Sequence, residues 1–290
     1  MSRRVRKEAM PLIDSFFDKL PRSIFKRSEL GRLLEENRGH WGVAASTTAQ
    51  QFIELLLSET RLHEIRLEFP PRPEIRFAWG DASIYQLLMS LNRKAYCSHY
   101  TAMVLHGLTE QIPKTWYVNI EQPAKPKPPG ELSQSGIDAA LRRAPRKTKR
   151  IALYDDQRIC VLNGMQTGNL GVVEMTAPDG AQVRVTNIER TLIDITVRAC
   201  YSGGVFEVAK AFEAAKGTAS INKLAAMLKK LDYVYPYYQA VGFYVERAGY
   251  RDAAVDLLRK FEMKYDFYLD HGLKDKAYAK TWRLYVPKGL

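Results

Sequence analysis

Residues 96–118 read Tyr-Cys-Ser-His-Tyr-Thr-Ala-Met-Val-Leu-His-Gly-Leu-Thr-Glu-Gln-Ile-Pro-Lys-Thr-Trp-Tyr-Val, a pattern that predicts a short helix, a turn and a strand. Ser98 is suited to the N-cap of the helix, and apolar residues follow it at roughly helical spacing. Gly107 can adopt the left-handed conformation that ends many helices, whereas Pro113 cannot continue one. The β-rich residues 115–120 favour a strand. We expect this unit to lie in the core.

The segments around this unit predict an α+β domain with a helical C-terminal half, placed at residues 81–290. Its first element is a helix with Ile84, Leu87, Leu88 and Leu91 on one face. Residues 122–133 contain four prolines, which exclude regular structure. The remaining expected elements are a short helix at 137–143, strands at 151–154, 158–162, 171–176 and 182–186, helices beginning at 187, 205, 221, 237 and 252, and two C-terminal strands at 266–269 and 281–286 that rejoin the sheet.

The first eighty residues change from helical to strand periodicity. Apolar residues predict helices within 4–20, from Ser28 to about residue 37, and from Thr47 to Glu59, the last with Thr47 and Gln50 at capping-box spacing. Apolar and charged residues then alternate on both sides of Pro70-Pro71-Arg72-Pro73, which predicts a hairpin. Three helices followed by a hairpin is the order of a winged helix-turn-helix, which we place at residues 1–80.

In such modules the third helix enters the major groove and its first turns contact base edges. Amides pair with adenine and methyl groups contact thymine, whereas basic side chains bind phosphates or a narrow minor groove. The candidate DNA contacts are Arg3, Arg4, Arg6, Lys26, Arg27, Thr47, Thr48, Gln50, Gln51 and Arg72. The same element order also serves in protein-docking domains, and the third helix has no arginine or lysine before Arg61. Both interpretations remain open at this point.

Composition narrows the possible functions. The net charge of +12 over 290 residues favours a nucleic acid or an acidic protein as partner. No apolar run is long enough to span a membrane, and the basic N-terminus lacks a secretory h-region. The three cysteines, Cys97, Cys160 and Cys200, are far apart, so no disulfide framework is expected. We therefore expect a cytoplasmic protein of about two domains.

A basic segment follows the short helix of the second domain. Six of its nine residues are basic and none is acidic: Arg142, Arg143, Arg146, Lys147, Lys149 and Arg150. Such a segment binds phosphates or an acidic partner in some proteins and is a solvated surface in others.

Motifs of enzyme chemistry are missing. The chain has no nucleophile elbow, phosphate loop, dinucleotide fingerprint or His-Glu-x-x-His motif, so we expect no catalytic residue and no cofactor. Cys97, His99 and His106 do not have the spacing of a zinc site, and packing or local hydrogen bonding is expected there instead. Asp155-Asp156 is expected as an acidic turn, and Glu189, Arg190 and Asp194 are expected to form buried salt links to neighbouring elements.

Two blocks resemble the AbiEi antitoxins of type IV toxin–antitoxin and abortive-infection (phage-defence) systems. One runs from Ser98-His99-Tyr100-Thr101-Ala102 through Leu105-His106-Gly107-Leu108-Thr109 to Ile112-Pro113-Lys114-Thr115. The other runs from Asn187-Ile188-Glu189-Arg190-Thr191-Leu192-Ile193-Asp194 to Tyr201-Ser202-Gly203-Gly204.

The resemblance implies a winged helix-turn-helix that represses its own operon and a second domain that counteracts a nucleotidyltransferase-like toxin, directly or indirectly. We expect promoter DNA to be bound cooperatively on paired half-sites, because a single winged domain covers too little DNA for high selectivity. The alternative is an RNA-binding or RNA-modifying enzyme that uses the basic segment.

Overall fold

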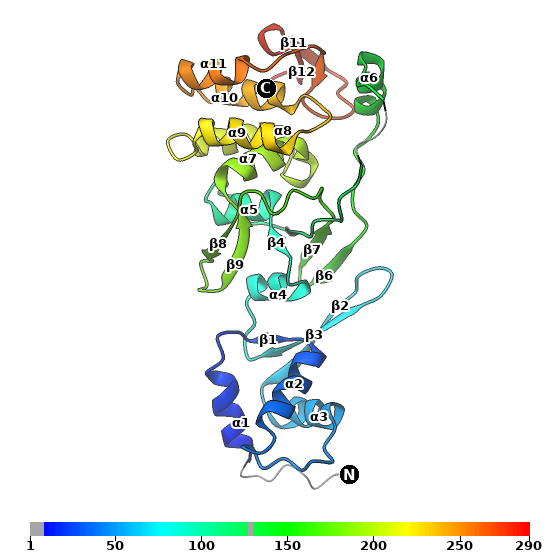
Figure 1. Ribbon diagram of the computed structural model, residues 1–290, viewed down its shortest axis with the longest axis vertical. Coiled ribbons are helices and arrows are strands. Elements are labelled where there is room, and N and C mark those ends of the chain that lie inside the picture. Colours follow the sequence, from blue (N-terminus) through cyan, green and yellow to red (C-terminus); the bar gives the residue numbers. More distant parts are fainter. Residues whose placement is uncertain (1–8, 127–129) are drawn as a thin grey trace.

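The computed structural model describes residues 9–126 and 130–290. It is a mixed α+β fold with an elongated shape, in which the N-terminal elements lie at one end and the C-terminal helices at the other (Figure 1). The N-terminal elements are α1 Ala9–Asp18, β1 Ile24–Phe25, α2 Arg27–Asn37, α3 Ala49–Glu59, β2 Leu62–Leu67 and β3 Glu74–Trp79. Both strand pairs of their sheet, in the order β1-β3-β2, are antiparallel.

The helix starts of this region differ slightly from the prediction. Lys26 rather than Ser28 is the N-cap of α2, and its backbone N–H donates to the Glu29 carboxylate over 2.8 Å. The capping box of α3 is formed by Thr48 and Gln51, one residue later than predicted. The helix faces enclose an apolar core around Trp41, which stacks on Phe52 at a centroid distance of 5.6 Å.

Helix α4, Ile84–Leu91, lies between the N-terminal sheet and the next sheet (Figure 1). One hydrophobic cluster joins its Leu87 and Leu88 to Leu67 and Phe69 on one side and to strands of the second sheet on the other. Ser23 donates through its backbone N–H to the side-chain oxygen of Gln86 over 2.7 Å. Apolar contacts therefore cross the predicted boundary at residues 80 and 81, although the division into two domains stays a prediction.

The second sheet has six strands in the order β6-β7-β5-β4-β9-β8. Strands β5 and β7 are parallel, as are β4 and β9, whereas the other three pairs are antiparallel. The strand bounds are β4 Tyr96–Cys97, β5 Thr115–Asn119, β6 Ile151–Tyr154, β7 Gln157–Leu162, β8 Val172–Thr176 and β9 Gln182–Thr186.

The stretch from 96 to 118 forms the predicted helix, turn and strand. Helix α5, His99–Leu105, ends at Gly107, whose φ is +65°. The N–H of Leu108 donates to the carbonyl of Met103 over 2.8 Å and that of Gly107 to Val104 over 3.1 Å, which is the hydrogen-bond pattern of a Schellman motif. Strands β4 and β5 place the stretch at the centre of the six-stranded sheet.

The C-terminal half is mostly helical, as predicted. It contains α6 Gln134–Arg142, α7 Ile188–Val197, α8 Val205–Ala214, α9 Ile221–Leu231, α10 Tyr237–Arg247 and α11 Asp252–Arg259, with 3-10 turns at Ala199–Tyr201 and Lys280–Trp282. The C-terminal strands do not rejoin the central sheet, contrary to the prediction. Strands β10 Phe267–Tyr268, β11 Lys276–Ala279 and β12 Leu284–Pro287 form a separate sheet in the order β10-β12-β11. Within residues 9–126 and 130–290, no helix is long and apolar enough to cross a membrane.

Trp282 anchors this small sheet to α10. Its ring is fully buried, and its indole N–H donates to the Glu246 carboxylate over 2.6 Å. The ring lies so close to Gly242 that a Cβ atom there would stand 2.0 Å from it. Only a residue without a side chain fits beneath Trp282, since such a contact forces the backbone or the ring to move.

Replacing Gly242 by alanine is expected to lower the free energy of unfolding by about 1–3 kcal/mol, because the added methyl group overpacks the contact with Trp282. Urea unfolding followed by circular dichroism measures the change. The control is Gly39→Ala, since a Cβ at Gly39 meets nothing within 4 Å. Equal stability of the two variants would contradict the packing argument.

Candidate nucleic-acid interface and basic segment

The N-terminal end of α3 presents an exposed polar surface. Thr48, Gln50, Gln51 and Glu54 are exposed on it. The Gln51 side chain accepts from the backbone N–H of Thr48 over 3.0 Å, so it caps the helix in this structure. Gln50 accepts a hydrogen bond from Arg27 and donates to Glu54 over 2.5 Å. Both amides must exchange these local partners before they can contact a base.

The other residues that the sequence predicts to contact DNA lie in different surroundings. Thr47 is buried, with 7% of its surface exposed, which removes it from the candidate base contacts. Lys26 points toward α4, where its ammonium group lies 3.5 Å from the carbonyl oxygen of Leu91. Arg72 is exposed in the turn between β2 and β3. Arg3, Arg4 and Arg6 lie outside the described residues.

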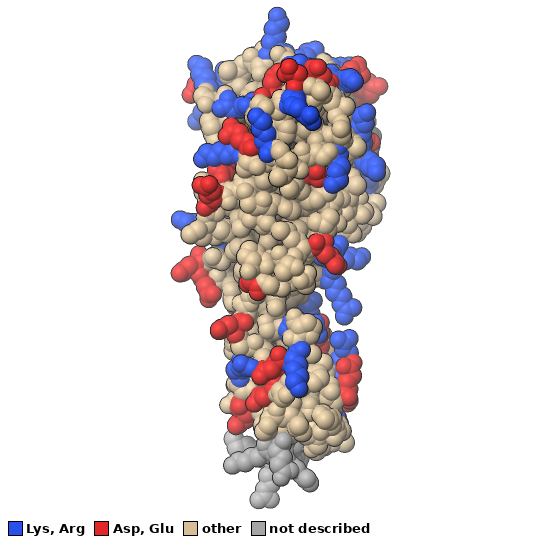
Figure 2. Space-filling view, turned by 90° about the vertical axis from the view of Figure 1, so that its left-hand side faces the viewer, with Lys and Arg blue, Asp and Glu red and all other residues tan. Residues whose placement is uncertain are grey.

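Most basic side chains of this region are paired with carboxylates. The pairs are Arg22–Glu29, Arg32–Glu36, Arg38–Glu35, Arg61–Asp18, Arg66–Glu68 and Arg76–Glu74. Basic and acidic side chains are accordingly mixed over the lower part of the molecule in Figure 2. Arg27 and Arg72 have no carboxylate partner within the described part of the chain, and Arg27 donates instead to Gln50.

The basic segment 142–150 connects the end of α6 to β6 and is mostly exposed. Arg142, Arg143, Arg146, Lys147 and Lys149 are exposed. The backbone is held at Thr148, whose N–H donates to the Tyr201 hydroxyl over 2.8 Å. A second anchor lies at Arg143, whose carbonyl oxygen is 2.8 Å from Nδ1 of His271. The segment therefore presents its charges from a fixed backbone.

Arg150 differs from the other basic residues of the segment. It pairs with Glu74 of β3, and its guanidinium lies 5.4 Å from the centroid of the buried Phe69 ring. Glu74 also binds Arg76 over 2.7 Å. Arg150 consequently joins the second half of the chain to the N-terminal hairpin, and its charge is partly neutralised there. The other five basic residues of the segment keep their side chains exposed.

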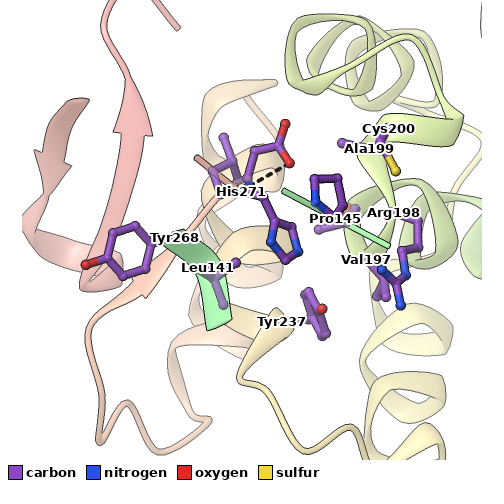
Figure 3. Close-up of a pocket in the computed structure, with 12 residues that line it drawn as sticks. Leu141, Pro145, Val197, Arg198, Ala199, Cys200, Tyr237, Tyr268 and His271 are labelled. Atoms are coloured by element: carbon purple, nitrogen blue, oxygen red, sulfur yellow. Dashed lines mark hydrogen bonds between the residues drawn. The ribbon is translucent and has the colours of Figure 1, made fainter. Parts of the chain in front are cut away.

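A small pocket lies beside the segment (Figure 3). Its lining includes Pro145 of the segment, Arg198, Cys200 and His271. The cavity volume of about 20 Å³ leaves room for one water molecule rather than an organic substrate. Arg198 is exposed, adds a positive charge beside the segment and was not predicted, because an isolated arginine at the end of a helix carries no sequence signal.

The residues considered for metal binding have structural roles. Burial lowers the pKa of His99 to about 4 and raises that of Cys97 to about 12, so both are neutral near pH 7. His106 Nε2 lies 2.6 Å from the carbonyl oxygen of Thr186. No group of three or more histidine, cysteine or acidic residues is arranged to hold a metal within the described ranges.

The buried ionic contacts of α7 are present, but one of them lies within the helix itself rather than reaching a neighbouring element. Arg190 and Asp194 are both buried, and their side chains pair over 2.8 Å. Arg190 also donates to the carbonyl of Leu170 over 2.7 Å, which fixes the loop before β8. Glu189 accepts from the backbone N–H of Ser220, the N-cap of α9, over 3.0 Å. This block therefore organises the helical half through buried hydrogen bonds.

No family model and no curated protein matches the chain. Among solved structures, it is similar to the crystal structure of the RV2827C protein from Mycobacterium tuberculosis. The TM-score is 0.61 at 14% sequence identity, and the match covers 98% of this chain and 93% of that chain. At this identity the likeness shows the fold alone, a mixed α+β arrangement shared over nearly the whole length.

Glu74 is expected to make stability sensitive to acid. Burial acts to raise the pKa of its carboxyl group, but hydrogen bonds from Arg150 and Arg76 outweigh burial and hold the pKa below its ordinary value. The stabilisation is therefore present above the unfolded-state pKa and is lost as the pH falls through the folded-state pKa. Glu74→Gln is expected to lose about 1–3 kcal/mol at pH 7 by leaving the buried Arg76 without its carboxylate.

Unfolding curves at pH 7 and at pH 4 or below provide the measurement, and the difference between wild type and Glu74→Gln should shrink on acidification. Glu59→Gln is the control, because Glu59 is exposed on α3. A difference that is independent of pH would contradict the assignment.

Proposed function

We propose that residues 1–80 form a winged helix-turn-helix that binds promoter DNA. The observation that carries this proposal is the order α1-β1-α2-α3-β2-β3, with the short β1 pairing against β3 on the side opposite β2. The hairpin β2–β3 corresponds to the wing, and α3 to the helix that reads the major groove. Its exposed Thr48, Gln50 and Gln51 offer hydrogen-bonding groups for base edges.

Phosphate contacts are assigned to Arg27 and Arg72. Arg27 contacts Gln50, which places a cation beside the reading helix, and Arg72 lies in the turn of the wing. With most other cations of this region paired internally, one module binds DNA modestly. Cooperative binding to two half-sites would supply the selectivity.

We further propose that the protein is an antitoxin that represses its own operon and counteracts a nucleotidyltransferase-like toxin. The two blocks that resemble the AbiEi antitoxins support this role, and both contribute buried residues to one hydrophobic cluster of the second half. The exposed basic segment is the proposed electrostatic contact, because charges of this kind steer encounter and select partners. No catalytic residue or cofactor is assigned.

Replacing Arg27 and Arg72 by alanine is expected to weaken binding to all DNA sequences and to reduce the salt slope by about two, since each phosphate contact contributes about 0.9. Replacing Gln50 and Gln51 by alanine should relax sequence preference by about 1–3 kcal/mol per lost bidentate contact. Fluorescence anisotropy on the protein's own promoter and on scrambled DNA distinguishes these effects.

Arg247→Ala is the control for this experiment, because Arg247 is exposed on α10 at the other end of the molecule. Circular dichroism checks that α3 survives the loss of the Gln51 cap. Unchanged promoter preference in the folded glutamine double variant would show that another surface reads the DNA.

Converting Arg146, Lys147 and Lys149 to glutamate is expected to leave the unfolding temperature nearly unchanged, because exposed charges contribute about 0–1 kcal/mol each. It should reduce protection of cells that express the cognate toxin. Arg150 is left intact because it pairs with Glu74. The control reverses three exposed charges elsewhere, Lys216, Arg247 and Lys288.

Full protection by the folded segment variant would show that these charges only interact with solvent. If the loss of protection in the segment variant is matched by a loss of RNA binding, the alternative of an RNA-binding enzyme is favoured.

A further inference from the structure

A groove lies between α9 and α11. These two helices are at the end of the molecule far from α3 (Figure 1). From α9 the groove is lined by Asn222, Ala225, Ala226 and Lys229, which repeat at helical spacing and share one face of the helix. From α11 and the residues after it, the lining is Leu257, Lys260 and Phe261. Its volume is about 250 Å³, more than ten times that of the pocket beside the basic segment.

The floor and rim of the groove differ in chemistry. Ala225 is buried and Leu257 and Phe261 are partly buried, so the floor is apolar. The two alanines create the depression, because longer side chains at these positions would fill it. Lys229 and Lys260 stand exposed on the rim.

The rim lysines are not neutralised within the chain. Neither has a carboxylate partner among residues 9–126 and 130–290, whereas the nearby Asp256 pairs with Arg259 over 2.9 Å. Arg259 also binds Glu246 of α10, so these two carboxylates are already paired. The exposed Glu262 follows Phe261 but forms no ion pair with either lysine within the described ranges. The groove thus combines an apolar floor with two exposed lysines.

We propose that this groove binds an acidic segment of a protein partner. One or two apolar side chains of that segment fill the space over Ala225 and Leu257, and flanking carboxylates pair with Lys229 and Lys260. Apolar anchors supply the affinity of such interfaces, and rim charges supply rate and selectivity. The inference does not depend on DNA binding or on the basic segment.

A nucleic acid fits the groove less well. Its bases need a free aromatic face for stacking. The Phe261 ring is stacked on Tyr238, with a centroid distance of 5.0 Å and an interplanar angle of 16°, and the ammonium group of Lys229 lies 5.5 Å from the Phe261 centroid. The Phe261 ring is therefore already packed against Tyr238 and Lys229, and the remaining floor of the groove is aliphatic.

The test uses the full chain and a fluorescein-labelled decapeptide of alternating Glu-Glu and Leu-Leu pairs, followed by fluorescence anisotropy. Wild type should bind this peptide and not the version with lysine in place of glutamate. Lys229→Glu with Lys260→Glu should weaken binding by about tenfold or more and reverse the peptide preference. Ala226→Trp should also abolish binding, because the indole fills the groove.

The matched control, Lys216→Glu with Lys230→Glu, makes the same charge change at two exposed residues that do not line the groove, and it should bind the acidic peptide within about twofold of wild type. All variants should retain helical circular dichroism and promoter binding, which separates this inference from the proposed function.

Four results would overturn the proposal. The first is an absence of peptide binding, and the second is equal loss in the control variant. The third is a dimer of the full chain that dissociates on the Lys229 and Lys260 changes, which would make the groove a contact between copies. Binding of a single-stranded oligonucleotide that depends on these lysines, without peptide binding, would likewise reject the acidic segment.

Discussion

The carbonyl oxygen of Leu91, at the end of α4, accepts from two cations of the N-terminal half. The guanidinium of Arg76 lies 3.3 Å away and the ammonium group of Lys26 lies 3.5 Å away. Arg76 is buried and also donates to Glu74 and to the carbonyl oxygen of Ser90. A buried cation is tolerated only when its hydrogen-bonding groups are satisfied. The end of α4 is therefore part of the environment that makes the N-terminal hairpin stable.

The same hairpin receives Arg150 from the basic segment, so one cluster of charges links three parts of the chain. Glu74 is the carboxylate between Arg76 and Arg150. Beneath this polar cluster, Leu67 and Phe69 pack with α4 in a continuous apolar core. A change at the segment that displaced Arg150 would reach the hairpin directly. This contact gives the two proposed activities a physical connection, although each uses a different exposed surface.

Local signals in the sequence predict most of the elements. Period-two alternation predicted the hairpin, and helical spacing with Gly107 predicted the central unit, because both depend on neighbouring residues. Strand β1 is two residues long and pairs only with β3, which is distant in sequence. No local sequence pattern therefore predicts it. The prediction that strands at 266–269 and 281–286 rejoin the central sheet is wrong for a related reason, because tertiary packing decides which strands pair.

The candidate site residues also fall into two groups, those whose exposure the sequence predicts and those whose surroundings depend on tertiary packing. The basic segment contains no acidic residue, and five of its basic residues are exposed as the sequence predicts: Arg142, Arg143, Arg146, Lys147 and Lys149. The burial of Thr47, the turn of Lys26 toward α4 and the pairing of Arg150 with Glu74 all depend on residues distant in sequence. The groove between α9 and α11 is likewise invisible until the two helices are brought together.

The contact between Gly242 and Trp282 can form only late in the synthesis of the chain. Residues of α10 leave the ribosome well before Trp282, so the helical half is made while the ring that completes its interior is still missing. Until then, the surface around Gly242 is open to water and to other apolar chains. The N-terminal core around Trp41, which is complete by Trp79, can fold while this surface waits for Trp282.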